Sequence, residues 1–118
     1  MAELDEQTLH NLAMNTVGKK LQEDDFEFLA VNSKLKKDPQ FVALKNKKLH
    51  FIIVRAIKYP ENPEIFDLKF MNTIKDHAQK FNAKTYYAGV GIANSTDYDQ
   101  PVNDAEDYVI NYKGLKEI

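Results

Sequence analysis

The sequence predicts an α/β fold at the border of the α+β class, with helices packed on a central mixed sheet. Residues 49–56 form the most apolar and most β-branched run of the 118-residue chain, which is typical of a strand buried on both faces. Apolar residues recur at helical spacing before this run and again after it. A second strand-like run follows the later helix, which predicts a right-handed crossover between parallel strands.

The composition is that of a single globular domain spanning residues 1–118. Hydrophobic residues make up 43% and charged residues 29%, and no apolar run approaches the roughly 20 residues that a bilayer requires. The acidic start of the chain lacks the apolar segment of a secretory signal, so we expect a cytoplasmic protein that does not bind membranes. The chain contains no cysteine, which excludes a disulfide framework and a cysteine-ligated metal site.

The first helix is expected from Asp5 to about Gln22. Asp5 or Thr8 is a suitable N-cap, because a short polar side chain can accept a hydrogen bond from the first turn. Spacings of three and four residues predict one buried stripe, made of Leu9, Leu12, Ala13, Thr16, Val17, Lys20 and Leu21.

Three closely spaced strands follow, at residues 26–31, 40–44 and 49–56. Pro39 places residues 32–39 in a loop, because proline cannot continue a helix there. Asn46 suits the positive φ of a tight turn between the second and third strands. These short connections predict an antiparallel meander.

Two prolines, at positions 60 and 63, end the central strand. A second helix is expected from about Ile65 or Asp67 to Phe81, and Asn82 is suited to close it in a left-handed conformation. Its predicted buried stripe consists of Phe70, Ile74, His77 or Ala78, and Phe81.

The rest of the chain completes an α-β-β-β-α-β core with an extra C-terminal strand. The strand at residues 84–92 contains Gly89 and Gly91, which are expected to admit a close neighbour or a bulge. A polar loop at residues 93–105 and a final strand at residues 107–112 follow.

Patterns typical of metal and phosphate sites are weak. The Gly89-Val90-Gly91 stretch does not continue as a phosphate-binding loop, and Asp97-Tyr98-Asp99 lacks the glycine and distal glutamate of a calcium loop. The three histidines His10, His50 and His77 lie on different elements at no ligand spacing, which argues against a metal site. His50, at a strand start, and His77, on a helix stripe, are expected to be packing residues. We therefore expect neither a metal nor a cofactor.

Positive charge is concentrated around the central strands. Residues 34–58 contain seven lysines, Arg55 and a single acid, a net charge of +7, although the whole chain carries −2. Clustered cations are typical of a polyanion-binding surface, but turn lysines also keep a hairpin soluble and protect its edges. The candidate nucleic-acid-binding residues are Lys34, Lys36, Lys37, Lys45, Lys47, Lys48 and Arg55.

Two stretches, Lys20–Asn32 and Gln40–Arg55, together with the order of the elements, resemble the restriction-endonuclease-like (PD-(D/E)XK) superfamily. The nearest likeness is to its small bacterial Holliday-junction-resolvase-like proteins. In that family an aspartate at the second strand and a Glu-x-Lys on the third hold Mg²⁺ and position the attacking water. The resemblance places Gln40 at the aspartate position, Ile53 at the glutamate position and Arg55 at the lysine position.

The resemblance implies a nuclease-like fold whose catalytic motif is degenerate. Ile53 cannot bind a metal, Gln40 offers a neutral oxygen, and an arginine keeps its proton and cannot act as a base. The glutamate that many relatives carry on the first helix would fall near Met14 or Asn15. Asp38, on the loop, is the acid best placed to compensate, and one acid alone would hold Mg²⁺ weakly.

Three functions from different classes stay open at this point. The first is a nuclease-fold protein without nuclease activity that binds nucleic acid or a protein partner. The second is a structural module that assembles, for example as a homodimer, through the strand at residues 107–112. The third is an enzyme with a relocated site, for which the candidates are Asp67, His77, Tyr86 and Tyr87. We favour binding, because no nucleophile–base pair is recognisable.

Overall fold

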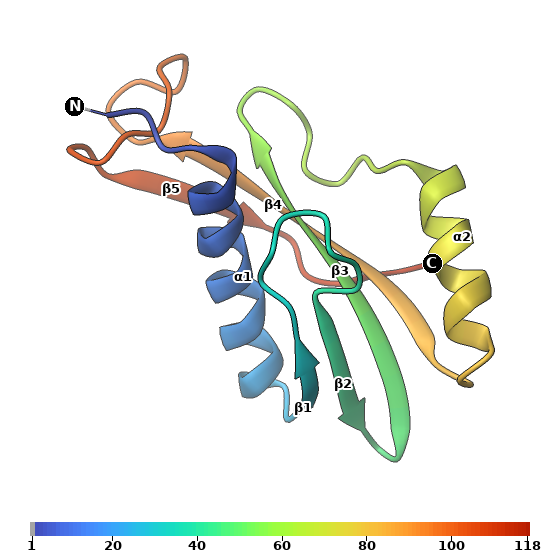
Figure 1. The fold of residues 1–118 in the computed structure, drawn as a ribbon. Coiled ribbons are helices and arrows are strands. Elements are labelled where there is room, and N and C mark those ends of the chain that lie inside the picture. Colours follow the sequence, from blue (N-terminus) through green and yellow to red (C-terminus); the bar gives the residue numbers. More distant parts are fainter. Residues whose placement is uncertain (1) are drawn as a thin grey trace.

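A computed structural model describes residues 2–118 and follows the predicted order of elements (Figure 1). In this part of the chain, two helices and six strands run in the order α1 (Glu6–Glu23), β1 (Glu27–Val31), β2 (Phe41–Lys45), β3 (Lys48–Lys58), α2 (Leu68–Gln79), β4 (Lys84–Asn94), β5 (Tyr108–Tyr112) and β6 (Lys116–Glu117). The predicted α-β-β-β-α-β core with an extra C-terminal strand is confirmed. Neither helix in the described residues is long and apolar enough to cross a membrane.

The strands form one mixed sheet in the order β1-β2-β3-β4-β5, with β6 also beside β4. The meander β1-β2-β3 is antiparallel, as predicted. Strands β3 and β4 are parallel, as predicted for two strands joined through a helix. Strands β5 and β6 both run antiparallel to β4 and pair with different parts of it. Strand β3 therefore lies at the centre, where the sequence places it.

The two helices lie on opposite faces of the sheet (Figure 1). Ile52 and Val54 of β3 belong to the core that contains the buried face of α1. Phe51 and Ile53, which point the other way, pack with Ala78 and Met71 of α2. The prediction that β3 is buried on both faces is confirmed. Each such side chain contributes about 1.5 to 3 kcal/mol through burial.

Helix α1 begins as the sequence predicts, but its buried face is rotated slightly. Asp5 is the N-cap, and the Thr8 N–H donates to its Oδ1 at 2.8 Å. Lys20, expected on the buried stripe, is exposed and forms an ion pair with Asp24 at 3.4 Å. Thr16 and Leu12 are only partly buried. The fully covered positions are Leu9, His10, Ala13, Met14, Val17 and Leu21.

Helix α2 is shorter than predicted, and this changes which residues it buries. The helix ends at Gln79, so Phe81 lies beyond it and is 54% exposed, contrary to the prediction. His77 is exposed as well, and Met71, which the predicted stripe omits, is buried together with Ala78. Phe70 and Ile74 are partly buried. Asn82 adopts the predicted left-handed conformation, with a φ of 54°.

The glycines of β4 make room for the segment between β3 and α2. A Cβ on Gly89 would lie 1.9 Å from the backbone oxygen of Pro63, and a Cβ on Gly91 would lie 3.2 Å from the Pro63 Cγ and from the Asn111 Cβ. The predicted close neighbour is confirmed, and it is Pro63. β4 also continues to Asn94, two residues beyond the predicted end.

We expect Gly89→Ala to lower the free energy of unfolding by about 3 kcal/mol, because backbone must move to admit the new methyl group. Gly91→Ala is the matched control. Its nearest neighbours, the Pro63 Cγ and the Asn111 Cβ, need to move by only a few tenths of an ångström, and the Asn111 backbone oxygen, at 3.4 Å, is at ordinary contact distance, so its loss should be smaller. Urea unfolding of both variants measures the difference. A larger loss for Gly91→Ala would contradict this account.

Candidate functional site

The three positions that the resemblance singled out, Gln40, Ile53 and Arg55, lie where the start of β2 meets the second half of β3. Gln40, immediately before β2, is fully buried. Its Oε1 accepts a hydrogen bond from the Val54 N–H at 2.7 Å, and its own N–H donates to the Ile52 oxygen at 3.1 Å. Its Nε2 donates to the Asp38 Oδ1 at 2.7 Å and to the Lys37 oxygen at 3.1 Å. The Gln40 side chain thus extends the hydrogen bonding of the β3 backbone by one step past Phe41, the first residue of β2.

Asp38 and Arg55 form a two-pronged ion pair beside Gln40. The Arg55 Nη1 donates to Asp38 Oδ1 at 2.8 Å, and its Nη2 donates to Oδ2 at 3.0 Å. Nη1 also donates to the Val54 oxygen at 3.0 Å, and the guanidinium lies 5.6 Å from the centre of the Phe70 ring. The Arg55 side chain is only 21% exposed and the Asp38 side chain only 11%. Both oxygens of the Asp38 carboxylate are therefore engaged by a cation.

The environment of Asp38 favours its charged form. Burial would raise the pKa of its carboxyl, but hydrogen bonds from Arg55 and Gln40 and the charge of Arg55 hold that pKa below its ordinary value. Asp38 is thus an ionised acceptor in a closed network. A metal ion that bound Asp38 would compete with the guanidinium of Arg55 for the same oxygens.

Ile53, which the resemblance places at the glutamate position, lies in an apolar core. Ile53 is fully buried and packs with Met71 of α2 and Tyr87 of β4. The partly buried residues around this group are Phe66, Phe70, Ile74 and Ile118. The side chains of Ile53 and Arg55 share one face of β3, as residues two apart must, but only Arg55 extends to Asp38.

Sequence reasoning missed His10, a fully buried residue of α1 close to this ion pair. Neither ring nitrogen has a hydrogen-bond partner in the described residues. Burial and the charge of Arg55 lower the pKa of His10, against the opposite effect of Asp38. The signal was present in the sequence, because His10 precedes Ala13 and Val17 by three and seven residues, the spacing of a buried helix face.

We expect His10→Leu to raise the free energy of unfolding by about 1 to 2 kcal/mol near neutral pH, because it removes two unpaired buried nitrogens. The folded-state pKa of His10 lies below 6.5, so the unfolded chain binds the extra proton first, and wild-type stability should fall as the pH drops below about 6.5. His10→Leu should flatten this decline, which chemical unfolding between about pH 7.5 and about pH 5 would measure.

His10→Gln is the control for this prediction. It keeps a buried polar group but cannot titrate, so it should flatten the pH dependence without adding stability at neutral pH. The remaining slope would come from other groups such as His50, whose pKa is also lowered by burial. An unchanged pH profile in both variants would contradict the assigned role of His10.

The first-helix residues that the resemblance singled out offer no replacement ligand. Met14 is buried and Asn15 is exposed, and neither carries a charge. Across residues 2–118, no three His, Cys, Asp or Glu side chains gather in an arrangement that would hold a metal ion.

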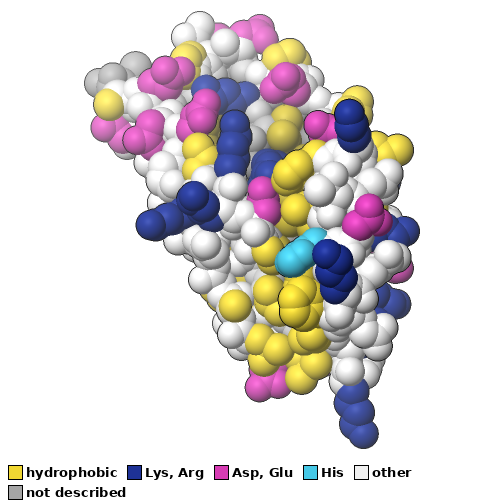
Figure 2. Space-filling model, turned by 45° about the vertical axis from the view of Figure 1, so that its right-hand side comes forward, with side chains coloured by type: hydrophobic (Ala, Val, Ile, Leu, Met, Phe, Trp, Pro, Cys, Tyr) yellow, Lys and Arg dark blue, Asp and Glu magenta, His cyan; other side chains and the backbone are white. Residues whose placement is uncertain are grey.

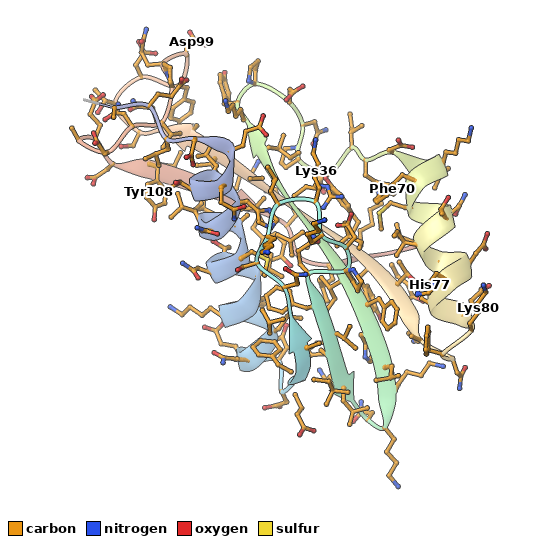
Figure 3. All side chains as sticks on the ribbon, viewed as in Figure 1. Lys36, Phe70, His77, Lys80, Asp99 and Tyr108 are labelled. Carbon is orange, nitrogen blue, oxygen red and sulfur yellow. The ribbon has the colours of Figure 1, made fainter. Side chains whose placement is uncertain are left out.

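A cleft of about 280 Å³ opens beside Arg55. It contains two further cations, Lys36 and Lys58, and two acids, Glu6 and Glu61; the apolar lining is Leu9, Leu35 and Ala56. Figure 3 labels Lys36, on the loop between β1 and β2, and Phe70, whose ring faces the guanidinium of Arg55. Lys34 and Lys37 are exposed on the same loop.

The structure separates the predicted basic residues into two groups. Lys34, Lys36 and Lys37 precede β2, whereas Lys45 ends β2, Lys47 lies in the turn and Lys48 begins β3. The length of β2, about 17 Å, separates the two groups. Figure 2 likewise shows basic side chains in separate places on this face, with acids among them.

The turn group has local structural contacts. The Lys45 ammonium lies 5.0 Å from the centre of the Phe26 ring, and the Lys48 Nζ donates to the Asn82 Oδ1 at 3.1 Å. Lys47 is exposed at the tip of the turn, where it and Asn46 both have positive φ, as predicted for Asn46. The loop group therefore forms the better candidate surface, because it adjoins the Arg55 cleft.

The residues proposed for a relocated enzyme site do not come together. Asp67 caps α2, with its Oδ1 accepting from the Phe70 N–H at 3.0 Å, whereas His77 lies ten residues later, about 15 Å along the helix axis. Tyr87 is buried against Phe66, with ring centres 4.9 Å apart. Tyr86 points to the opposite face of β4.

Comparison with known protein families gives one match. The family model described as "Domain of unknown function (DUF8840)" matches residues 7–118, which is nearly the entire chain. A search of curated proteins found no match, and neither did a search of solved structures.

Proposed function

The chain belongs to the DUF8840 family, and we propose that it works by binding a ligand rather than by nuclease chemistry. The observation that carries the proposal is the closed Asp38–Arg55–Gln40 network. A nuclease of the resembled superfamily would present two carboxylates to Mg²⁺ in this region. Here one acid is held by an arginine, and the second position is a buried isoleucine.

We propose nucleic acid as the ligand class. Lys34, Lys36 and Lys37 lie on one exposed loop, and Lys58 adds a fourth ammonium group across the Arg55 cleft. Lysines grouped in this way contact successive phosphates and release counterions on binding. Arg55 itself is a weaker candidate, because Asp38 neutralises it. The proposal places the protein in the cytoplasm, where nucleic acid is accessible.

Fluorescence anisotropy with labelled duplex, four-way junction and single-stranded DNA tests this proposal at several salt concentrations. We expect at least one of these probes to bind, with an affinity that falls steeply as salt rises. Binding to none of the probes at low salt, or a response that does not depend on salt, would refute the nucleic-acid proposal and favour a protein ligand.

Two triple variants separate a local site from the effect of total charge. Replacing Lys34, Lys36 and Lys37 with alanine should lower the logarithmic salt slope by about 2 to 3, since each duplex phosphate contact contributes about 0.9. Replacing Lys45, Lys47 and Lys48 with alanine removes the same charge from the other end of β2. Equal effects of the two variants would contradict binding at the loop.

A further inference from the structure

Strand β5 is an open edge of the sheet that carries exposed apolar side chains. It pairs with β4 only, and Tyr108, Val109 and Ile110 are 43%, 38% and 37% exposed. The strand contains no charged residue and no proline between Tyr108 and Tyr112. Figure 1 shows β5 along the outer side of the sheet, and Figure 3 labels Tyr108 there. An edge of this kind is able to pair with another strand.

The backbone groups that face outward from β5 follow from its pairing with β4. The Ser95 N–H donates to the Asp107 oxygen at 3.0 Å, so position 107 points its backbone groups toward β4. Backbone direction alternates along a strand, so positions 109 and 111 also face β4. The backbone N–H and C=O groups of Tyr108, Ile110 and Tyr112 therefore point away from β4, in the plane of the sheet. No backbone hydrogen bond from another segment of residues 2–118 reaches them.

The opposite edge of the sheet is protected in a way that β5 is not. Strand β1 has a shift in register between Phe28 and Ala30, which interrupts its edge. The pairing of β5 with β4 runs without a shift from Tyr108 to Tyr112. β5 is thus the more regular of the two open edges and the better template for a further strand.

The residues that flank β5 favour the β5 strand of a second copy of this chain as the partner for the open edge. Three antiparallel registers between β5 and a second β5 match at least two outward residues of each copy; their centres lie at position 109, 110 or 111. Centring on Ile110 uses all three outward residues and places Tyr108 opposite Tyr112. It also places Asp107 of each copy opposite Lys113 of the other, and the other two registers do not. Both side chains are exposed, and neither has an ion-pair partner among the described residues.

We propose that two copies of this chain form a dimer by antiparallel pairing of β5 with β5 about Ile110. The pairing joins the two sheets into one continuous sheet through six backbone hydrogen bonds, two at each outward-facing pair. The side chains of Ile110 meet at the two-fold axis, and an Asp107–Lys113 ion pair closes each end. The inference is independent of nucleic-acid binding, because β5 and the basic loop belong to different strands.

Light scattering after size-exclusion chromatography should give about twice the chain mass of 13.6 kDa, with dissociation on dilution. In the dimer, amide exchange measured by NMR should be slow at Tyr108, Ile110 and Tyr112, which exchange rapidly in the monomer. The amides of Val109 and Asn111 face β4 and should be slow in both states. A monomer at every concentration, or a dimer whose outward amides stay unprotected, would overturn the proposal.

Single cysteines test the register, since the chain has none of its own. Ile110→Cys should form an intermolecular disulfide under mild oxidation, because the opposed Cα atoms would lie about 5.5 Å apart. Tyr108→Cys is the control, since the two equivalent Cα atoms would be about 14 Å apart and should not crosslink. Crosslinking of Tyr108→Cys instead of Ile110→Cys would overturn the register.

A charge exchange gives a second test that leaves the apolar side chains intact. Asp107→Lys alone and Lys113→Asp alone should each weaken dimerisation by about tenfold, because two attractions become two repulsions. The double variant restores opposite charges and should return the dissociation constant to near the wild-type value. A double variant as weak as the single ones would refute the proposed pairing of these residues.

Discussion

Ile53→Glu should unfold the protein or lower its free energy of unfolding by at least about 4 kcal/mol, and it should not create a nuclease. The change restores the glutamate of the resembled motif. Ile53 is fully buried among Met71, Tyr87 and other apolar side chains of the α2 face, and the cation on the same face of β3, Arg55, is already paired with Asp38. The variant therefore buries an unpaired charge or forces it to bind a proton.

Circular dichroism and urea unfolding measure this effect, and a plasmid-nicking assay with Mg²⁺ tests for activity. Ile65→Glu is the matched control, since Ile65 is 70% exposed and the same substitution should change stability by less than about 0.5 kcal/mol. Ile53→Val should lose only about 1 kcal/mol. A stably folded Ile53→Glu protein that cuts DNA would contradict our interpretation of β3.

Arg55→Met should lower the free energy of unfolding by about 3 kcal/mol at neutral pH, because it leaves the largely covered carboxylate of Asp38 without its cation. The double variant Asp38→Asn, Arg55→Met should recover a large part of this loss, since it leaves no unpaired charge. Urea unfolding of the two single variants and the double variant gives the coupling between the positions. Lys58→Met, an exposed change on the same strand, is the control and should have little effect.

The acid dependence gives the second measure of this ion pair. The folded-state pKa of Asp38 lies below its ordinary value of 3.8, so its contribution to stability is present above about pH 3.8 and is lost as the pH falls through the folded-state pKa. The difference between wild type and Arg55→Met should therefore shrink in acid, where Asp38 becomes protonated. A difference that stays constant from neutral pH to about pH 3 would show that Arg55 acts through packing alone.

Local signals account for the parts of the fold that the sequence predicted well. The apolar run in β3, the cap at Asp5 and the positive φ at Asn46 each depend on a few consecutive residues and their immediate neighbours. The end of α2 was predicted two residues too late, because Phe81 continues the helical spacing after the helix has ended at Gln79. Periodicity identifies a face and is a weak guide to a terminus.

The candidate site depended on contacts between distant residues, and here sequence reasoning was incomplete. It identified Gln40, Ile53 and Arg55 through a resemblance and singled out Asp38, but it did not predict the bond between Asp38 and Arg55. His10 lies 28 residues before Asp38 in the chain, and nothing local indicates that α1 brings it near the ion pair. The lysines of residues 34–48 lie in one stretch of the sequence, but β2 runs between the loop group and the turn group and so places them at opposite ends of the strand.

The sequence by itself determined the order of the elements, the buried central strand and the isoleucine at position 53, because these depend on residue type and short-range spacing. Only the tertiary structure decided that Asp38 is engaged by Arg55, that His10 is buried with no hydrogen-bond partner among the described residues, and that β5 is an open edge. Each of these depends on which segments meet after the chain has folded, and burial and pairing with distant residues then determine the charge and accessibility of each group.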